Sequence, residues 1–141
     1  MTPGLPTPGL LTPRLGRAYR ATRYAVDDIP VRIGRRSPRL DPPGSDGAGF
    51  DRRGPIVLLT AWNPRSRRMP QGWNHRMQDR LRAHLRRRTV RDADGRLRRW
   101  REAHVAVQAD PRWCLVLARR FRQHAIVVIL RHQPVRLVML D

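Results

Sequence analysis

The sequence predicts a single α+β domain, in which a mixed, mostly antiparallel sheet of five or six strands carries two main helices. Three observations lead to this fold class. Short apolar or alternating runs, typical of strands, recur along the chain. Two other segments repeat apolar residues at the spacing of a helix face. A length of 141 residues suits one domain with a buried core.

Residues 1–16 are predicted to form a disordered tail. The phrase TPGL occurs at positions 2–5 and again at 7–10, and proline and glycine are too frequent there for a helix or strand. We therefore expect the folded domain to span residues 17–141. Within it, residues 41–55 contain four glycines and three prolines, which predicts a long mobile loop.

Two strands are expected before this loop. The alternation of arginine with small and aromatic residues over positions 17–26 predicts a half-buried strand, and Asp27 and Asp28 end it. Residues 29–33 follow as a second strand of a hairpin. Pro30 confines that strand to an edge or to a strand start, because proline has no N–H to donate to a neighbour.

The middle of the chain predicts a buried strand, a polar junction and a helix. The unbroken apolar run at 56–59 is typical of a buried strand, and the polar junction follows between Thr60 and Asn74. Pro70 lies near the expected helix start, where its missing N–H costs nothing. Asn74 falls on the buried side of this helix, beside the apolar stripe formed by Trp73, Met77, Leu81 and Leu85.

The last third predicts a turn, three strands and a second helix. Residues 88–101 form a polar connector, itself a candidate hairpin with its turn at Asp94-Gly95, before a strand at 102–107. Asp110-Pro111 has the signature of a helix start. The helix is supported by apolar residues at helical spacing: Cys114, Leu117, Ala118 and Phe121. Two final strands are expected at 125–130 and 135–140.

The charge is strongly positive, with 30 basic residues, all arginine, against 11 acidic ones, for a net charge of +19. Such an excess favours a polyanionic partner, most often nucleic acid, although coding bias towards arginine is an alternative source. Between positions 65 and 101 there are fourteen arginines and three aspartates. The candidate nucleic-acid-binding residues are Arg65, Arg67, Arg68, Arg76, Arg80 and Arg87.

Several classes of site are disfavoured. Cys114 is the one cysteine, which excludes an intramolecular disulfide and fits a cytoplasmic protein. The histidines and acids show no metal-ligand spacing, and no cofactor motif is present, so neither a metal nor a cofactor is expected. The longest apolar run, at 125–130, is far shorter than the roughly 20 residues of a membrane helix, so no membrane partner is expected. The sequence does not indicate an oligomeric state.

Three phrases resemble an uncharacterised bacterial family, the domain of unknown function 3293: TAWNPRS at 60–66, WRE at 100–102 and LARRFRQHAIV at 117–127. The resemblance extends over residues 19–140. It implies a recurring unit, without a known activity, made of Asn63, Asn74, Glu102, Phe121 and Gln123. Many members have glycine where this chain has Arg122, so we do not expect a glycine-type backbone at this position.

Three functions follow as hypotheses. The first is a non-catalytic module that binds an anion or nucleic acid, either RNA or single-stranded DNA. The second is a small enzyme or ligand-binding protein working at the polar junction, with candidate residues Trp62, Asn63, Asn74, Glu102, Arg119 and Gln123. In the third, the junction is purely structural, and Asn63 and Asn74 satisfy buried backbone groups.

Glu102, the single glutamate, allows two interpretations. We expect it to pair with one of the many arginines. As an alternative, it shares a strand face with His104, and together with Asn63 these residues would form a general-base constellation. The folded geometry decides whether these side chains line a cleft or only satisfy one another.

Overall fold

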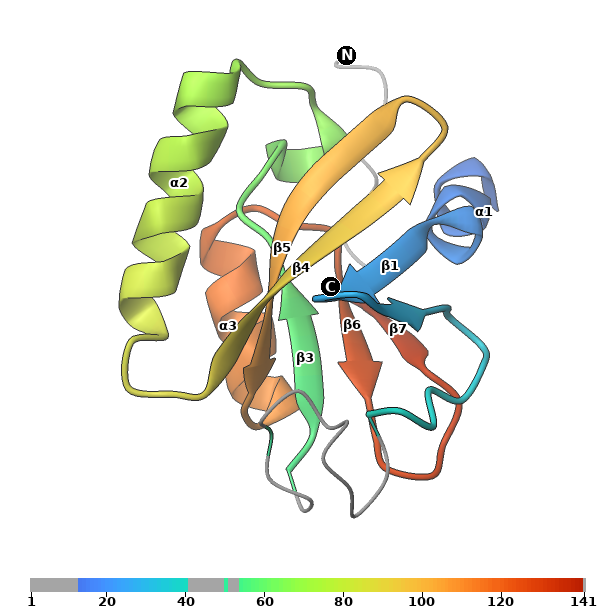
Figure 1. Ribbon diagram of the computed structural model, residues 1–141. Helices are drawn as coiled ribbons and strands as arrows, with labels where there is room; N and C mark the ends of the chain where they lie inside the picture. The colour runs from blue at the N-terminus through green and yellow to red at the C-terminus, as the bar shows by residue number, and fades with distance from the viewer. Residues whose placement is uncertain (1–12, 41–49, 51–53, 141) are drawn as a thin grey trace.

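The computed structural model describes residues 13–40, 50 and 54–140, and confirms a single α+β domain (Figure 1). Within this part, seven strands form one curled sheet in the order β2-β1-β4-β5-β3-β6-β7. All strand pairs are antiparallel. The strands are β1 (Arg23–Val26), β2 (Ile29–Val31), β3 (Ile56–Leu59), β4 (Val90–Leu97), β5 (Trp100–Gln108), β6 (Ala125–Ile129) and β7 (Arg136–Met139). The predicted five or six strands were thus too few.

Three α-helices accompany the sheet in the described residues, where two were predicted. They are α1 (Pro13–Ala21), α2 (Gln71–His84) and α3 (Pro111–Arg120), and a short 3-10 helix, η1 (Pro64–Ser66), follows β3. Helices α2 and α3 lie together on one side of the sheet, whereas α1 lies apart from them, beside β1 (Figure 1). In this part of the chain, no helix combines the length and apolar character required to cross a membrane.

Helix α1 corrects two expectations. It begins at Pro13, inside the predicted tail, and it occupies much of the stretch predicted as a strand from Arg17, so that β1 starts only at Arg23. Thr22 follows the helix, and both its N–H and its hydroxyl donate to the carbonyl of Ala18. The predicted tail up to residue 12 and most of the loop predicted at 41–55 lie outside the described residues.

The connector predicted before β5 is a long hairpin. Strands β4 and β5 pair from Val90↔Val107 to Leu97↔Trp100, and the turn lies at Arg98 and Arg99, where Arg98 has φ 54°. The turn predicted at Asp94-Gly95 was wrong, because both residues lie within β4. The prediction of β2 as an edge strand is confirmed by its place at one end of the sheet.

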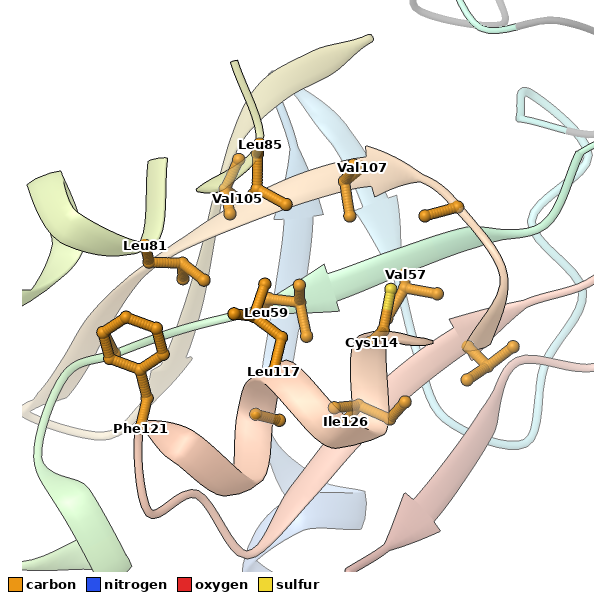
Figure 2. Packing of buried hydrophobic residues seen from close by; sticks show 14 residues of the cluster. Val57, Leu59, Leu81, Leu85, Val105, Val107, Cys114, Leu117, Phe121 and Ile126 are labelled. Atoms are coloured by element: carbon orange, nitrogen blue, oxygen red, sulfur yellow. The ribbon is translucent and has the colours of Figure 1, made fainter. Parts of the chain in front are cut away.

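The outer face of the sheet packs against α2 and α3 (Figure 2). Alternate residues of the central strands, such as Val57, Leu59 and Val105, meet Leu81 of α2 and Leu117 of α3. The alternation explains the unbroken apolar run of β3, since its other side chains are buried on the opposite face. Trp73 is only partly buried, which differs from its predicted place in the core.

The inner face curls around a second apolar cluster, so that the sheet forms a half-barrel. Leu58, Ala106 and Val127 belong to this cluster, together with residues of β1 and β2. The curl brings the two edge strands towards each other. Ile33, just after β2, forms a parallel bridge with Val135, just before β7.

Helix α3 begins and ends with recognisable caps. The Asp110 carboxylate accepts from the N–H of Arg112 at 2.8 Å, which confirms the predicted start. At the end, Arg122 N–H bonds to Arg119 O at 3.0 Å and Gln123 N–H bonds to Ala118 O at 3.1 Å. This is a Schellman motif, with Arg122 at the left-handed position and φ 56°. The glycine-type backbone is therefore present although the residue is arginine, contrary to our expectation.

Candidate functional site

The junction between β3 and α2 is built around a pair of buried asparagines. Asn63 has φ 46°, a left-handed conformation that asparagine tolerates better than most residues. Its N–H donates to Asn74 Oδ1 at 3.0 Å, and its own Oδ1 accepts from Asn74 Nδ2 at 3.1 Å and from Met69 N–H at 2.9 Å. The two amides therefore hold the loop against the start of α2, as the structural hypothesis expects.

Asn63 also has a second role. Its Nδ2 donates to Glu102 Oε2 on β5 at 3.0 Å, so one side chain links the junction to the inner face of the sheet. Gln123 closes the same region from the far end of α3, since its Nε2 donates to Trp62 O at 3.0 Å and to Phe121 O at 3.2 Å. The structure thus brings together most of the predicted junction residues.

A cavity of about 430 Å³ opens on the inner face, next to this network. Its walls come from β1, β3, β4, β5 and β6, and α1 contributes Leu15, Ala18 and Tyr19. The lining is mainly apolar and aromatic. A few polar side chains join it, and among the ionisable ones are Arg14 of α1, Glu102 and His104. The half-barrel is therefore filled by the apolar cluster in one part and hollow in another.

A row of facing residues shapes the cavity. Tyr24 of β1 lies opposite Gly95 of β4, which lies opposite Glu102 of β5. A Cβ added at Gly95 would lie 3.0 Å from the Tyr24 ring and 3.3 Å from that of His104. Glycine at this position lets the tyrosine ring lie close over the sheet, edge-on to His104 with ring centroids 5.6 Å apart.

The Glu102 carboxyl lies largely buried in the cavity wall. Burial raises its pKa to about 7, although hydrogen bonds from the side chains of Asn63 and Trp100 partly oppose the shift. Among the described residues it makes no ion pair with an arginine, so the expected pairing was wrong. Near neutral pH this carboxyl is poised between its protonated and ionised forms.

His104 is the neutral companion of this acid. Burial lowers its pKa to about 4. Nδ1 lies 3.1 Å from the carbonyl oxygen of Glu102, and because a carbonyl can only accept, this nitrogen carries the proton. Nε2 is therefore the acceptor of the ring. Asn63, Glu102 and His104 thus line the same cavity.

Tyr19 connects α1 to the junction through a side-chain hydrogen bond with Ser66. Burial raises the pKa of its phenol to about 12, so it stays protonated and can donate at neutral pH. Sequence reasoning missed Tyr19, Tyr24 and Gly95 as parts of a site. An isolated glycine within a strand is a usable signal for close approach, but Asp94-Gly95 also has the form of a turn.

The remaining predicted residues lie elsewhere. Arg119 is exposed on α3 and lines neither the inner cavity nor the hollow described below. The six candidate nucleic-acid residues are all exposed, and in the described part of the chain none of them forms an ion pair: Arg65, Arg67, Arg68, Arg76, Arg80 and Arg87. Within that same part, no group of three or more His, Cys, Asp or Glu side chains is placed to hold a metal ion.

Comparison with known proteins adds a family. The model of the family described as "Protein of unknown function (DUF3293)" matches residues 59–126. This segment is similar to the DUF3293 family. The resemblance seen in the sequence is thereby confirmed over a shorter span than residues 19–140, and the DUF3293 segment includes Asn63, Asn74, Glu102 and Gln123. No curated protein matches the chain. Likewise, no solved structure matches it.

Proposed function

We propose that this chain binds a small, largely apolar ligand in the inner cavity, and that Glu102 is the polar group that recognises it. A volume of about 430 Å³ is in the range of ordinary ligand pockets. Aromatic and aliphatic walls with a few converging polar groups are also typical of such pockets. The position inside a curled sheet is a common one for ligand sites.

One observation carries this proposal. Glu102 faces the cavity with its charge unpaired in the described part of the chain, although the protein has 30 arginines and only 11 acids. Holding a largely buried carboxyl without an ion-pair partner costs free energy. Such costly, perturbed acids concentrate at functional sites. A purely structural junction needs only an acceptor for Asn63 Nδ2, which a neutral amide would also supply, so it does not require an acid at position 102.

The chemistry of the wall indicates the ligand class. An ionised Glu102 accepts hydrogen bonds, and so does the neutral His104 at Nε2. We therefore infer a ligand with an apolar body and an N–H-bearing group, such as an amine or amide nitrogen. Because the bound N–H group favours the ionised carboxylate, affinity should rise as the pH passes upward through about 7.

The test uses N-phenyl-1-naphthylamine, a neutral aromatic amine that fluoresces in apolar surroundings. The full chain should bind this probe, and Ala125→Leu, which fills the cavity, should weaken binding at least tenfold. Ala83→Leu makes the same change at an exposed position on α2 and should leave affinity unchanged. Equal binding by all three proteins, or no binding to the unmodified chain, would sink the proposal.

A second candidate function follows from the exposed arginines. Their lack of ion pairs in the described residues leaves the guanidinium groups available to the phosphates of RNA or single-stranded DNA. Affinity for a single-stranded oligonucleotide should then fall by about 0.7 log units per log unit of salt for each neutralised phosphate. The double variant Arg80→Glu with Arg87→Glu should bind the oligonucleotide more weakly than the unmodified chain at the same salt concentration. Unchanged affinity in this double variant argues against the second function.

A further inference from the structure

A second hollow, of about 350 Å³, lies between the start of α2 and the β4–β5 turn. Three arginines line it from different segments: Arg68 precedes α2, Arg99 lies in the turn, and Arg101 follows on β5. No acidic residue of the described chain contributes to its lining. We propose that this hollow is an anion site that takes a phosphoryl group, and this site is separate from the inner cavity.

The arginines bring charge that the protein does not neutralise. In the described residues, Arg68 and Arg99 have no carboxylate partner, and Arg101 reaches Asp94 only at 3.9 Å. The guanidinium of Arg68 lies over the Trp100 ring, 4.8 Å from its centroid, so the ring orients the group without consuming its N–H donors. Guanidinium groups placed in this way suit the oxygens of a phosphate.

The start of α2 adds to the positive potential. Pro70 provides no capping side chain, and the first turn has no acidic residue. Gln71 and Gly72 are exposed and precede the first intrahelical bond, from Asn74 N–H to Pro70 O at 3.0 Å. Their N–H groups have no partner within the helix. Uncapped N–H groups at a helix start favour anions, and here three arginines converge on the same place.

Trp62 gives an independent indication of a ligand. The residue lines the hollow and is only 4% exposed, yet its indole N–H has no hydrogen-bond partner in the described structure. An unsatisfied buried donor costs free energy and calls for an explanation, such as an absent acceptor. Asn63 and Asn74 line the same hollow, but they hold each other and so contribute rigidity. Because this N–H is closed off from solvent, a ligand reaches it only if the ring shifts, and the first contacts of an anion in the hollow come from the arginines and the start of α2.

Phosphate is the anion that best matches this donor set. Three guanidinium groups and a helix start provide more donors and charge than a single carboxylate can use, whereas a phosphoryl group has three strongly accepting oxygens and about two negative charges. The same chemistry is found in a free phosphorylated small molecule and at the end of a nucleic-acid strand. The experiment therefore includes both sources.

Binding to the full chain is measured by calorimetry with inorganic phosphate, adenosine monophosphate and a 5′-phosphorylated deoxythymidine decamer. The site variant combines Arg68→Gln with Arg99→Gln. A control with the same loss of charge combines Arg112→Gln with Arg120→Gln, two exposed residues of α3, which does not line the hollow. The site variant should bind at least tenfold more weakly, and the control should change less than twofold.

The outcomes separate the possibilities. Binding of phosphate or the mononucleotide, lost in the site variant, assigns the hollow to a small phosphorylated ligand. Loss confined to the decamer assigns it to a nucleic-acid strand. Equal losses in both double variants, or no binding of any probe at low salt, overturn the proposal. Ala125→Leu, which fills the inner cavity, should leave phosphate binding unchanged, so this site can fail or hold independently of the cavity.

Discussion

Asn63 donates its side-chain N–H to the Glu102 carboxylate at 3.0 Å, while its carbonyl oxygen accepts from Asn74 at 3.1 Å. One residue in a left-handed conformation thus fixes both the start of α2 and the acid of the inner cavity. A displacement of the junction loop would therefore break a hydrogen bond to this carboxylate. The stability of the junction and the chemistry of the cavity can therefore be tested through the same few side chains.

Replacing the acid by its neutral isostere should remove one contribution to the pH dependence of stability. The folded pKa of Glu102, about 7, lies above its ordinary value of 4.5, so this group makes folding less favourable as pH rises from about 4.5 to 7. Glu102→Gln should therefore gain about 1–3 kcal/mol relative to the unmodified chain between pH 5 and pH 8. Urea unfolding at both pH values measures this. A constant difference between the two proteins would contradict it.

His104 should make the stability depend on pH in the opposite direction. The folded pKa of His104, about 4, lies below the ordinary 6.5, so its contribution is complete above pH 6.5 and is lost as pH falls towards 4. His104→Phe keeps a ring against Tyr24 but cannot take up a proton. Relative to the unmodified chain, the variant should gain about 1–3 kcal/mol between pH 7 and pH 4. A constant stability difference between the two proteins across this interval would show that folding leaves the pKa of His104 unchanged, contrary to this prediction.

Adding one negative charge to the asparagine pair should destabilise the fold. Asn74→Asp keeps the acceptor for Asn63 N–H but places an oxygen opposite Asn63 Oδ1 and Met69 O, which now face a donor at 3.1 and 3.3 Å. We expect a loss of about 2–4 kcal/mol at pH 7, measured by chemical unfolding. Gln71→Glu is the control, since it changes an exposed amide in the same helix and should cost nothing.

Glycine at the C-terminal end of α3 should increase the stability of the fold. Arg122 has φ 56°, a conformation that costs most residues about 1 kcal/mol and glycine very little. Arg122→Gly should therefore raise the free energy of unfolding by about 0.5–1 kcal/mol. Arg120→Gly removes the same side chain two residues earlier, inside the helix, and should lower it by about 1 kcal/mol. The same sign for both variants would contradict this explanation.

Local chemistry made much of the fold predictable. Asp110-Pro111 fixes a helix start by its own hydrogen bond, and the run of β3 requires burial on both faces whatever surrounds it. The sequence did not reveal helix α1, because arginines alternating with small residues and a tyrosine suit both a strand and a short helix. The sequence around Gly95 resembled a turn because the Tyr24 ring, which requires the glycine, lies about seventy positions away in the chain.

The sequence indicated several residues of the inner site, but it did not indicate the cavity that they line. Asn63, Glu102 and His104 stood out as residue types, and strand alternation placed the last two on one face. The cavity, however, arises from the curl of the whole sheet and from α1, and neither leaves a local signal. The same holds for the burial of Glu102 in a cavity wall that Tyr24 of β1 and Trp100 of β5 also line.

The bridge between Ile33 and Val135 has a consequence for how the protein behaves in a crowded solution. Unpaired edge strands can recruit other chains and begin aggregation. In this protein the outermost strands β2 and β7 turn towards each other, and Gly34 N–H to Val135 O at 2.8 Å and Val135 N–H to Arg35 O at 2.9 Å close the seam. The backbone groups that would recruit a neighbour at that point are occupied within the molecule, and curling thus protects the chain from self-association there.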